Sequence, residues 1–209
     1  MEEIQQDYEL NTDEEKREYL KDVFSSLNMP DRIVDKLPME RVNVLIEAEE
    51  FNLAKNNEHA NSMARDGESK DAVEGSLKKY ILWARKPYNS TKYTYSLLVW
   101  FEWLSVPTWR FDDTISVDIG AGSIVDYSPG AIISYKKNGT EQYDVFNEES
   151  TEYKGVGTAC VFLIDLPNGI TSISNLELTA YYDVLSSSDE LTVSGQYFHK
   201  ILSCTTSID

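Results

Sequence analysis

Two adjacent carboxylates, Asp112 and Asp113, are the side chains of this chain most suited to chemistry. They follow Trp109 and Arg110, where we expect an aromatic strand to have ended. Ca²⁺ prefers carboxylate oxygens, and a carboxylate can also supply one half of a glycosidase acid pair. We therefore predict Asp112 and Asp113 as candidate Ca²⁺ ligands, and Trp109 and Arg110 as candidate ligand-binding residues. A solvated acidic turn is the alternative, because no Asp-x-Asp-x-Asp-Gly run supports a calcium loop.

Other catalytic patterns are absent from the sequence. His59 and His199 are the only histidines, and no Gly-x-Ser-x-Gly elbow presents a nucleophile. Cys160 and Cys204 lack the spacing of a zinc site. They either form a disulfide, which would close a loop of roughly 40 residues, or remain separate thiols. We expect a protein without catalytic activity.

The aromatic residues around this region allow two interpretations. Trp100, Trp103, Trp109 and Tyr88 could form a flat platform on which sugars stack. From Tyr93 to Trp103, however, every odd position is apolar. Because alternate side chains of a strand share one face, this run predicts a long strand whose odd face enters a core.

Composition narrows the classes of partner. The chain has 209 residues and a formal net charge of −17, from 36 acidic and 19 basic residues. Nucleic-acid binding requires clustered Lys and Arg, which are missing, so we expect no nucleic-acid partner. No apolar window reaches the roughly 18 residues of a membrane span. The start of the chain has no secretory signal pattern, so we expect either a cytoplasmic protein or a secreted chain whose Met1 is not its native start.

The N-terminal 55 residues have the pattern of about three short helices. Thr12 and Glu15 form a capping-box pattern before a helix that we expect to end near Asn28. A second helix is predicted over residues 31–37. Pro38 then begins a third helix, whose apolar stripe extends to Phe51 and Ala54.

The stretch LNMPDRIVDKLPMERVNVLIEAEEF, residues 27–51, resembles segments near the mature N-termini of uncharacterised secreted proteins of Gram-positive bacteria. In those proteins a small helix, a Leu-Pro pair and an acidic helix precede a β-rich domain. The resemblance implies an extracellular setting and implies no activity.

Residues 56–75 have the polar composition of a linker, and residues 76–209 have the pattern of strands. Asn138-Gly139 predicts a tight hairpin between two of these strands. Residues 157–166 are nearly all apolar and predict a strand buried on both faces. About eight strands without interleaved helices indicate an antiparallel β-sandwich, either immunoglobulin-like or jelly-roll.

Three functions are compatible with these features. The first is a non-catalytic extracellular interaction or binding module, whose partner is an unknown protein or carbohydrate. The second is a carbohydrate-binding or carbohydrate-processing β-sandwich. The third is a phage or other assembly subunit whose helices pack on a partner. A sandwich fold alone does not decide among them.

Overall fold

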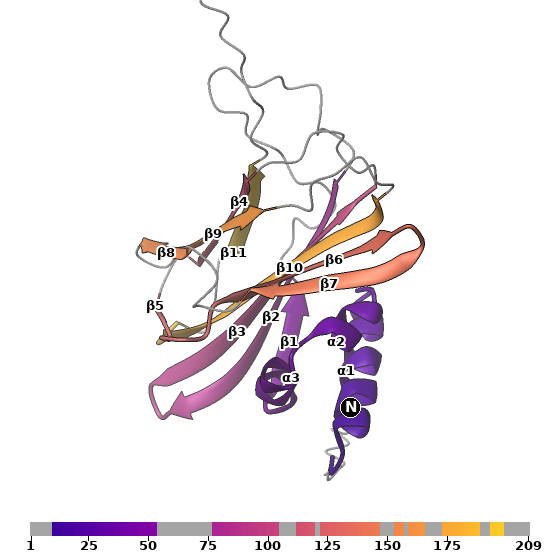
Figure 1. Cartoon of the computed structure of the whole chain (residues 1–209). Coiled ribbons are helices and arrows are strands. Elements are labelled where there is room, and N and C mark those ends of the chain that lie inside the picture. The colour runs from indigo at the N-terminus through magenta and orange to yellow at the C-terminus, as the bar shows by residue number, and fades with distance from the viewer. Residues whose placement is uncertain are drawn as a thin grey trace, which may run out of the picture. The chain divides into compact units, whose positions relative to one another are not determined.

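The chain divides into two compact units, Met1–Ala48 and Glu49–Asp209. The computed structural model describes residues 10–53, 77–104, 112–119, 122–146, 153–156, 159–165, 173–188 and 193–198 (Figure 1). The first unit is helical and the second is built from strands. The predicted linker, residues 56–75, lies outside the described residues.

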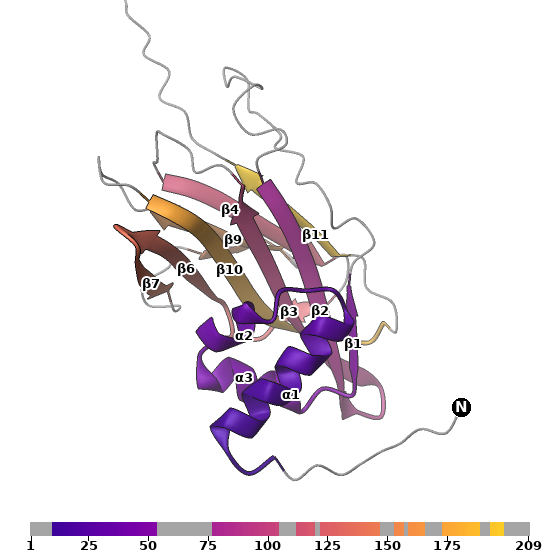
Figure 2. The same cartoon turned by 90° about the vertical axis from the view of Figure 1, so that its right-hand side faces the viewer.

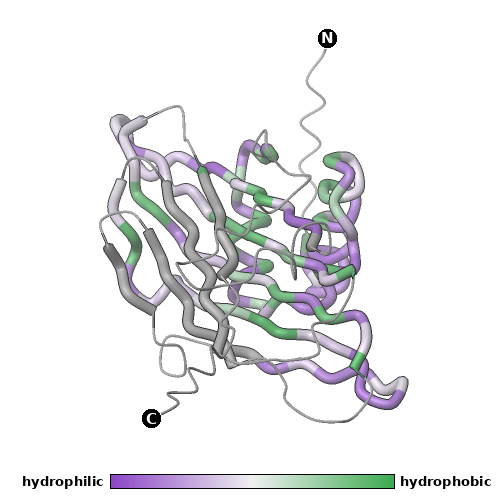
Figure 3. The backbone as a smooth tube through the Cα atoms, turned by 90° about the horizontal axis from the view of Figure 1, so that it is seen from above, coloured by the Kyte–Doolittle hydropathy of each residue, from purple (hydrophilic) through white to green (hydrophobic). Residues whose placement is uncertain are grey.

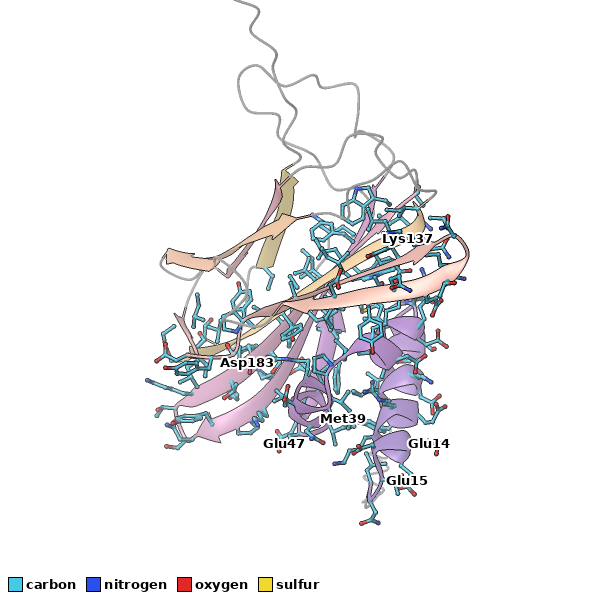
Figure 4. All side chains as sticks on the ribbon, in the orientation of Figure 1. Glu14, Glu15, Met39, Glu47, Lys137 and Asp183 are labelled. Carbon is cyan, nitrogen blue, oxygen red and sulfur yellow. The ribbon has the colours of Figure 1, made fainter. Side chains whose placement is uncertain are left out.

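The first unit contains α1 (Asp13–Ser26), α2 (Arg32–Lys36) and α3 (Met39–Ile46). The predicted capping box is confirmed: the Glu15 backbone N–H donates to Thr12 Oγ1 at 3.2 Å, and the Thr12 N–H donates to Glu15 Oε2 at 2.9 Å. These bonds satisfy N–H groups that a helix start leaves without a partner. Glu15 lies at the N-terminal end of α1, as does its neighbour Glu14 (Figure 4).

Basic side chains of α1 hold α2 beside it (Figure 2). The guanidinium of Arg17 donates to the backbone oxygens of Val34 and Leu37, the latter at 2.9 Å. A cation at the end of α2 bonds carbonyls of its last turn and complements the helix dipole. Lys21 forms an ion pair with Asp35 at 2.9 Å. Helices this short are marginal alone, and these bonds help to hold α2 against α1.

The third helix is shorter than the sequence predicts. It ends at Ile46, and Phe51 lies in strand β1 (Glu50–Leu53) instead. Phe51 pairs with Ala84 of strand β2 (Leu77–Asn89). Periodicity alone does not separate a short apolar strand from a helix end, and here the pairing with a distant strand decides the conformation. The first unit accordingly ends at Ala48, earlier than the predicted boundary at residue 55.

Seven of the described strands form one antiparallel sheet, which confirms a mainly β unit (Figure 1). The sheet order is β1-β2-β3-β10-β6-β7, and β5 also pairs with β10. The strands not yet introduced are β3 (Lys92–Trp103), β5 (Ser123–Ile124), β6 (Gly130–Lys137), β7 (Thr140–Phe146) and β10 (Ile173–Ser186).

The odd face of β3 enters the core, as its alternation predicts. Tyr95, Leu97, Val99 and Phe101 are all at most 1% exposed. They share this face with residues of β10, because Leu97 lies opposite Tyr182 and Phe101 opposite Leu178. Hydrophobic stretches recur along the described strands (Figure 3). The core cluster consists of Ile81, Leu97, Val99, Phe101, Trp103, Ala131, Ile133, Leu176, Leu178, Ala180, Tyr182 and Val184.

The even face of β3 is buried as well, since Leu98 and Trp100 are fully covered. The sequence predicts one buried face, and the structure gives this strand two. Leu98 lies opposite Leu82 of β2 and Tyr181 of β10, so the second buried face continues across the neighbouring strands. Strands β3 and β10 therefore occupy the centre of the unit.

A second antiparallel sheet has the order β11-β4-β9-β8. Its strands are β4 (Asp112–Ile119), β8 (Tyr153–Val156), β9 (Ala159–Asp165) and β11 (Val193–Phe198). The predicted apolar strand at residues 157–166 is β9, where Cys160 pairs with Val117. Cys204 lies outside the described residues, so the disulfide stays untested.

Two turns show how local residues set the connections. Asn138 and Gly139 have φ of 51° and 81°, the positive values that a tight primed hairpin requires, and they confirm the predicted β6–β7 turn. At the β2–β3 connection, β2 continues to Asn89 before the chain turns at residues 90–91. The strand does so with a register shift between Pro87 and Asn89.

Gly130 is required by a close approach. A Cβ built on it would lie 2.6 Å from ring atoms of Tyr181, which is 8% exposed. We predict that Gly130→Ala lowers the free energy of unfolding by about 1–3 kcal/mol, since the buried ring has to move. Chemical denaturation measures this change. In a Tyr181→Ala background the same substitution should cost much less, and equal costs in the two backgrounds would contradict the explanation.

The capping box predicts a pH dependence. Hydrogen bonds from Thr12, backbone first and then side chain, lower the pKa of Glu15. A lowered folded-state pKa stabilises the fold above the unfolded value of about 4.3, and this stabilisation is lost as the pH falls through the folded value. We expect Glu15→Gln to remove part of the acid-induced loss of helical circular dichroism. Glu14→Gln, in the same turn, should leave that part in place.

Candidate functional site

The structure leaves the predicted site at Asp112 and Asp113 untested. Trp109 and Arg110 lie outside the described residues. Asp112 and Asp113 begin β4, where their backbones lie opposite Asp165 and Ile164 of β9. The register thus adds Asp165 to the same end of the sheet, a neighbour that sequence spacing cannot reveal. Among the described residues, no group of three His, Cys, Asp or Glu side chains is placed to hold a metal ion.

The tryptophan platform is contradicted at two of its members. Trp100 is 0% exposed and Trp103 is 4% exposed, so neither ring can stack on a sugar. Trp103 belongs to the core cluster, and the Trp100 ring packs against Tyr80 with centroids 5.2 Å apart. The core interpretation is therefore correct for both. Tyr88, by contrast, is 62% exposed.

A different group of side chains comes together near the turn between β2 and β3. We call it the aromatic–arginine cluster: Glu50, Trp83, Arg85, Tyr93 and Tyr95. Glu50 pairs with Arg85, and Arg85 with Tyr95, so these three positions form one row across β1, β2 and β3. Directly opposite residues share a face, so the row lies on the side of the sheet that carries the core cluster.

Ring contacts link the members of this cluster. The Arg85 guanidinium lies 4.7 Å from the centroid of the Tyr93 ring, within cation–π range. Tyr95 contacts both Trp83 and Tyr93 edge to face, with centroids 5.9 Å and 6.2 Å apart. The Tyr95 hydroxyl donates to the backbone oxygen of Ser188 at 2.6 Å. The cluster therefore connects three strands and the segment that follows β10.

Arg85 is the charged centre of the cluster and forms an ion pair with Glu50. Burial acts to lower its pKa, but the bond with Tyr95 and the charge of Glu50 outweigh burial and raise the pKa above its ordinary value. The Glu49 backbone N–H also donates to the Arg85 carbonyl at 2.8 Å. Backbone and side chain of Arg85 thus both hold the start of the second unit on β2.

Beyond the cluster lies the hairpin tip, residues 87–92, all of which are exposed. Asn89 Oδ1 accepts hydrogen bonds from the Thr91 backbone N–H at 2.9 Å and from Thr91 Oγ1 at 3.1 Å. These bonds fix the turn in the manner of an Asx motif. The tip therefore presents Tyr88, with its large ring and its hydroxyl, on a restrained support.

Sequence reasoning missed this cluster for an identifiable reason. Tyr93 and Tyr95 are visible in the alternation, and Arg85 lies two residues before Pro87. The sequence pattern predicts a helix over Glu50, which hides its place beside Arg85. A strand assignment for residues 50–53 removes this obstacle, but the pairing of Glu50 with Arg85 also depends on strand order, which the sequence does not show.

Two further carboxylates lie side by side on the opposite face. Glu177 of β10 pairs with Glu102 of β3, and Lys78 lies opposite Glu102 with its Nζ 3.8 Å from the Glu102 carboxylate. Like charges directly opposite are unfavourable, and Lys78 offsets part of that repulsion. Glu177 is only 3% exposed, so this pair does not form an open acid pair.

No described helix has the length and apolar character needed to cross a membrane. No protein-family model, curated protein or solved structure matches the chain. The candidate function therefore rests on the aromatic–arginine cluster and the hairpin tip.

We predict that Arg85→Met loosens β1. It removes the ion pair and the cation–π contact while keeping an apolar stem. Because the side chains of Arg85 and Glu50 are 25% and 39% exposed, the free energy of unfolding should fall by only about 1 kcal/mol. Amide hydrogen exchange over residues 50–53 should become faster. Lys92→Met, an exposed change in the same hairpin, should leave that exchange unchanged.

Proposed function

We propose that the protein is a non-catalytic extracellular binding module, and that the hairpin tip is its contact surface. The observation that carries this proposal is the 62% exposure of Tyr88 at the end of a hairpin whose base is held by the aromatic–arginine cluster. Tyrosine is enriched in protein interfaces because it offers large contact area and one polar group. A restrained support lowers the entropy lost on binding.

The proposal also includes the way in which the two sheets pack. The two antiparallel sheets pack as a β-sandwich of immunoglobulin-like or jelly-roll type. Two observations support it: the core cluster gives the larger sheet one continuous apolar face, and Val193 of β11 packs against that cluster. An apolar sheet face requires a second layer, and a second sheet is the usual one in mainly β units.

A protein is the partner class that we favour. Trp100 and Trp103 are buried, which removes the main support for carbohydrate stacking, whereas the exposed tip is tyrosine-based. Carbohydrate binding remains the alternative for Tyr88 itself. The extracellular setting rests on the resemblance of residues 27–51 to secreted proteins. Detection of the protein in the culture medium of its source, rather than in the cells, tests that setting.

The binding proposal predicts an effect of Tyr88→Ser. We expect the chain to bind members of an arrayed panel of extracellular proteins, and Tyr88→Ser to weaken that binding at least about tenfold, as for a central interface tyrosine. Surface plasmon resonance measures the affinity. Tyr143→Ser is the matched control, because Tyr143 is 69% exposed on β7.

The outcomes separate the candidate functions. Binding to a glycan panel that depends on Tyr88 would favour the carbohydrate alternative. A concentration-dependent mass with no binding to either panel would favour an assembly subunit. Equal affinities of Tyr88→Ser and wild type would exclude the hairpin tip as the contact surface.

A further inference from the structure

Tyr127 adopts a backbone conformation that tyrosine rarely takes. Its φ is +61°, in the left-handed region where a Cβ crowds the following carbonyl. The other three non-glycine residues with positive φ in the described part of the chain are all asparagines, the type best suited to that region. The sequence therefore uses the favourable residue at Asn28, Asn138 and Asn175, and an unfavourable one at Tyr127.

The conformation of Tyr127 is imposed by the turn around it. The Val125 N–H donates to the Asp183 carbonyl at 2.9 Å, and the Asp183 N–H donates to Ser128 Oγ at 2.9 Å. Ser128 Oγ donates to the Val125 carbonyl at 2.6 Å. Residues on both sides of Tyr127 are thus bonded to β10, in which Asp183 lies near one end (Figure 4).

The chain after the turn is also restrained. Pro129 is buried, and Gly130 lies directly beneath the Tyr181 ring. The backbone from Val125 to Gly130 therefore has little freedom to relieve the strain at Tyr127. The turn is a rigid support for one side chain.

Packing does not account for the tyrosine at this position. Its side chain is 86% exposed, the largest exposure among the exposed large hydrophobic residues described. A strained residue whose ring lies in solvent contributes little to the core, so asparagine or glycine would serve the fold better. Strain that the fold does not need is a recognised mark of a functional position.

We propose that Tyr127 is a preformed anchor for a partner protein with a basic surface, its ring entering an apolar pocket bordered by Lys or Arg. The exposed Asp126 beside it and the net charge of −17 select a basic partner. Tyrosine held in one backbone conformation offers contact area at small entropic cost. The inference rests on the proposed binding function and adds a second contact site and a partner class.

The first test needs no partner. If the fold does not require Tyr127, Tyr127→Asn relieves strain and raises the midpoint of thermal unfolding, by about 2 °C for a chain of this size. Tyr127→Phe, which keeps the same backbone demand, leaves the midpoint unchanged. A lower midpoint for Tyr127→Asn would show that the tyrosine serves the fold, and would overturn the proposal.

The second test uses a displayed library of random peptides as the probe, selected on the immobilised full chain. We expect enriched peptides to combine Lys or Arg with apolar residues, and to bind Tyr127→Asn at least about tenfold more weakly than wild type. Binding should fall at raised salt concentration. Enriched peptides without basic residues, or a selection in which no peptide distinguishes the wild type from Tyr127→Asn, would overturn the proposal.

Tyr88→Ser separates this proposal from the hairpin proposal. Peptides that lose affinity for Tyr127→Asn but not for Tyr88→Ser support the β5–β6 turn as an independent contact site. Peptides that depend on Tyr88 alone overturn the inference about Tyr127 while leaving the binding function in place.

Discussion

The pairing of β3 with β10 is the interaction on which the rest of the second unit depends. It joins residues 75 to 93 positions apart, from Glu102 opposite Glu177 to Tyr93 opposite Ser186. Its register aligns the odd positions of β3 with the even positions of β10, so that both contribute to one apolar face. A slip by one residue would turn each of these side chains to the other side. β2 and β6 then extend the sheet on the two sides of this pair.

Features that depend on neighbouring residues were predictable from the sequence. The alternation from Tyr93 to Trp103 identifies β3, and Asn138-Gly139 identifies the turn between β6 and β7, because both signals are local. Strand order was not predictable, since it depends on which distant strands meet. Phe51 illustrates the difference: its apolar character fits a helix or a strand, and only Ala84 across from it decides.

The same distinction applies to the candidate sites. Trp109 and Arg110 are predicted from their residue types and their place beside Asp112 and Asp113. Both lie outside the described residues. The aromatic–arginine cluster combines side chains from three strands with a carbonyl after β10, so no spacing in the sequence could predict it. Tyr127 was missed for another reason: a positive φ at tyrosine contradicts every local preference. A position that violates such a preference becomes visible only in the structure.

Pro87 has a consequence for the solubility of the chain. Sheet edges with free N–H groups invite strands of other molecules, and exposed aromatic hairpins are prone to aggregate. Among the described strands, β1 covers β2 only from Leu82 to Arg85. Just beyond that stretch the strand carries a proline, which has no N–H to offer an incoming strand, and its register shifts there. The edge beside the exposed Tyr88 thus lacks one of the N–H groups that an incoming strand would bond.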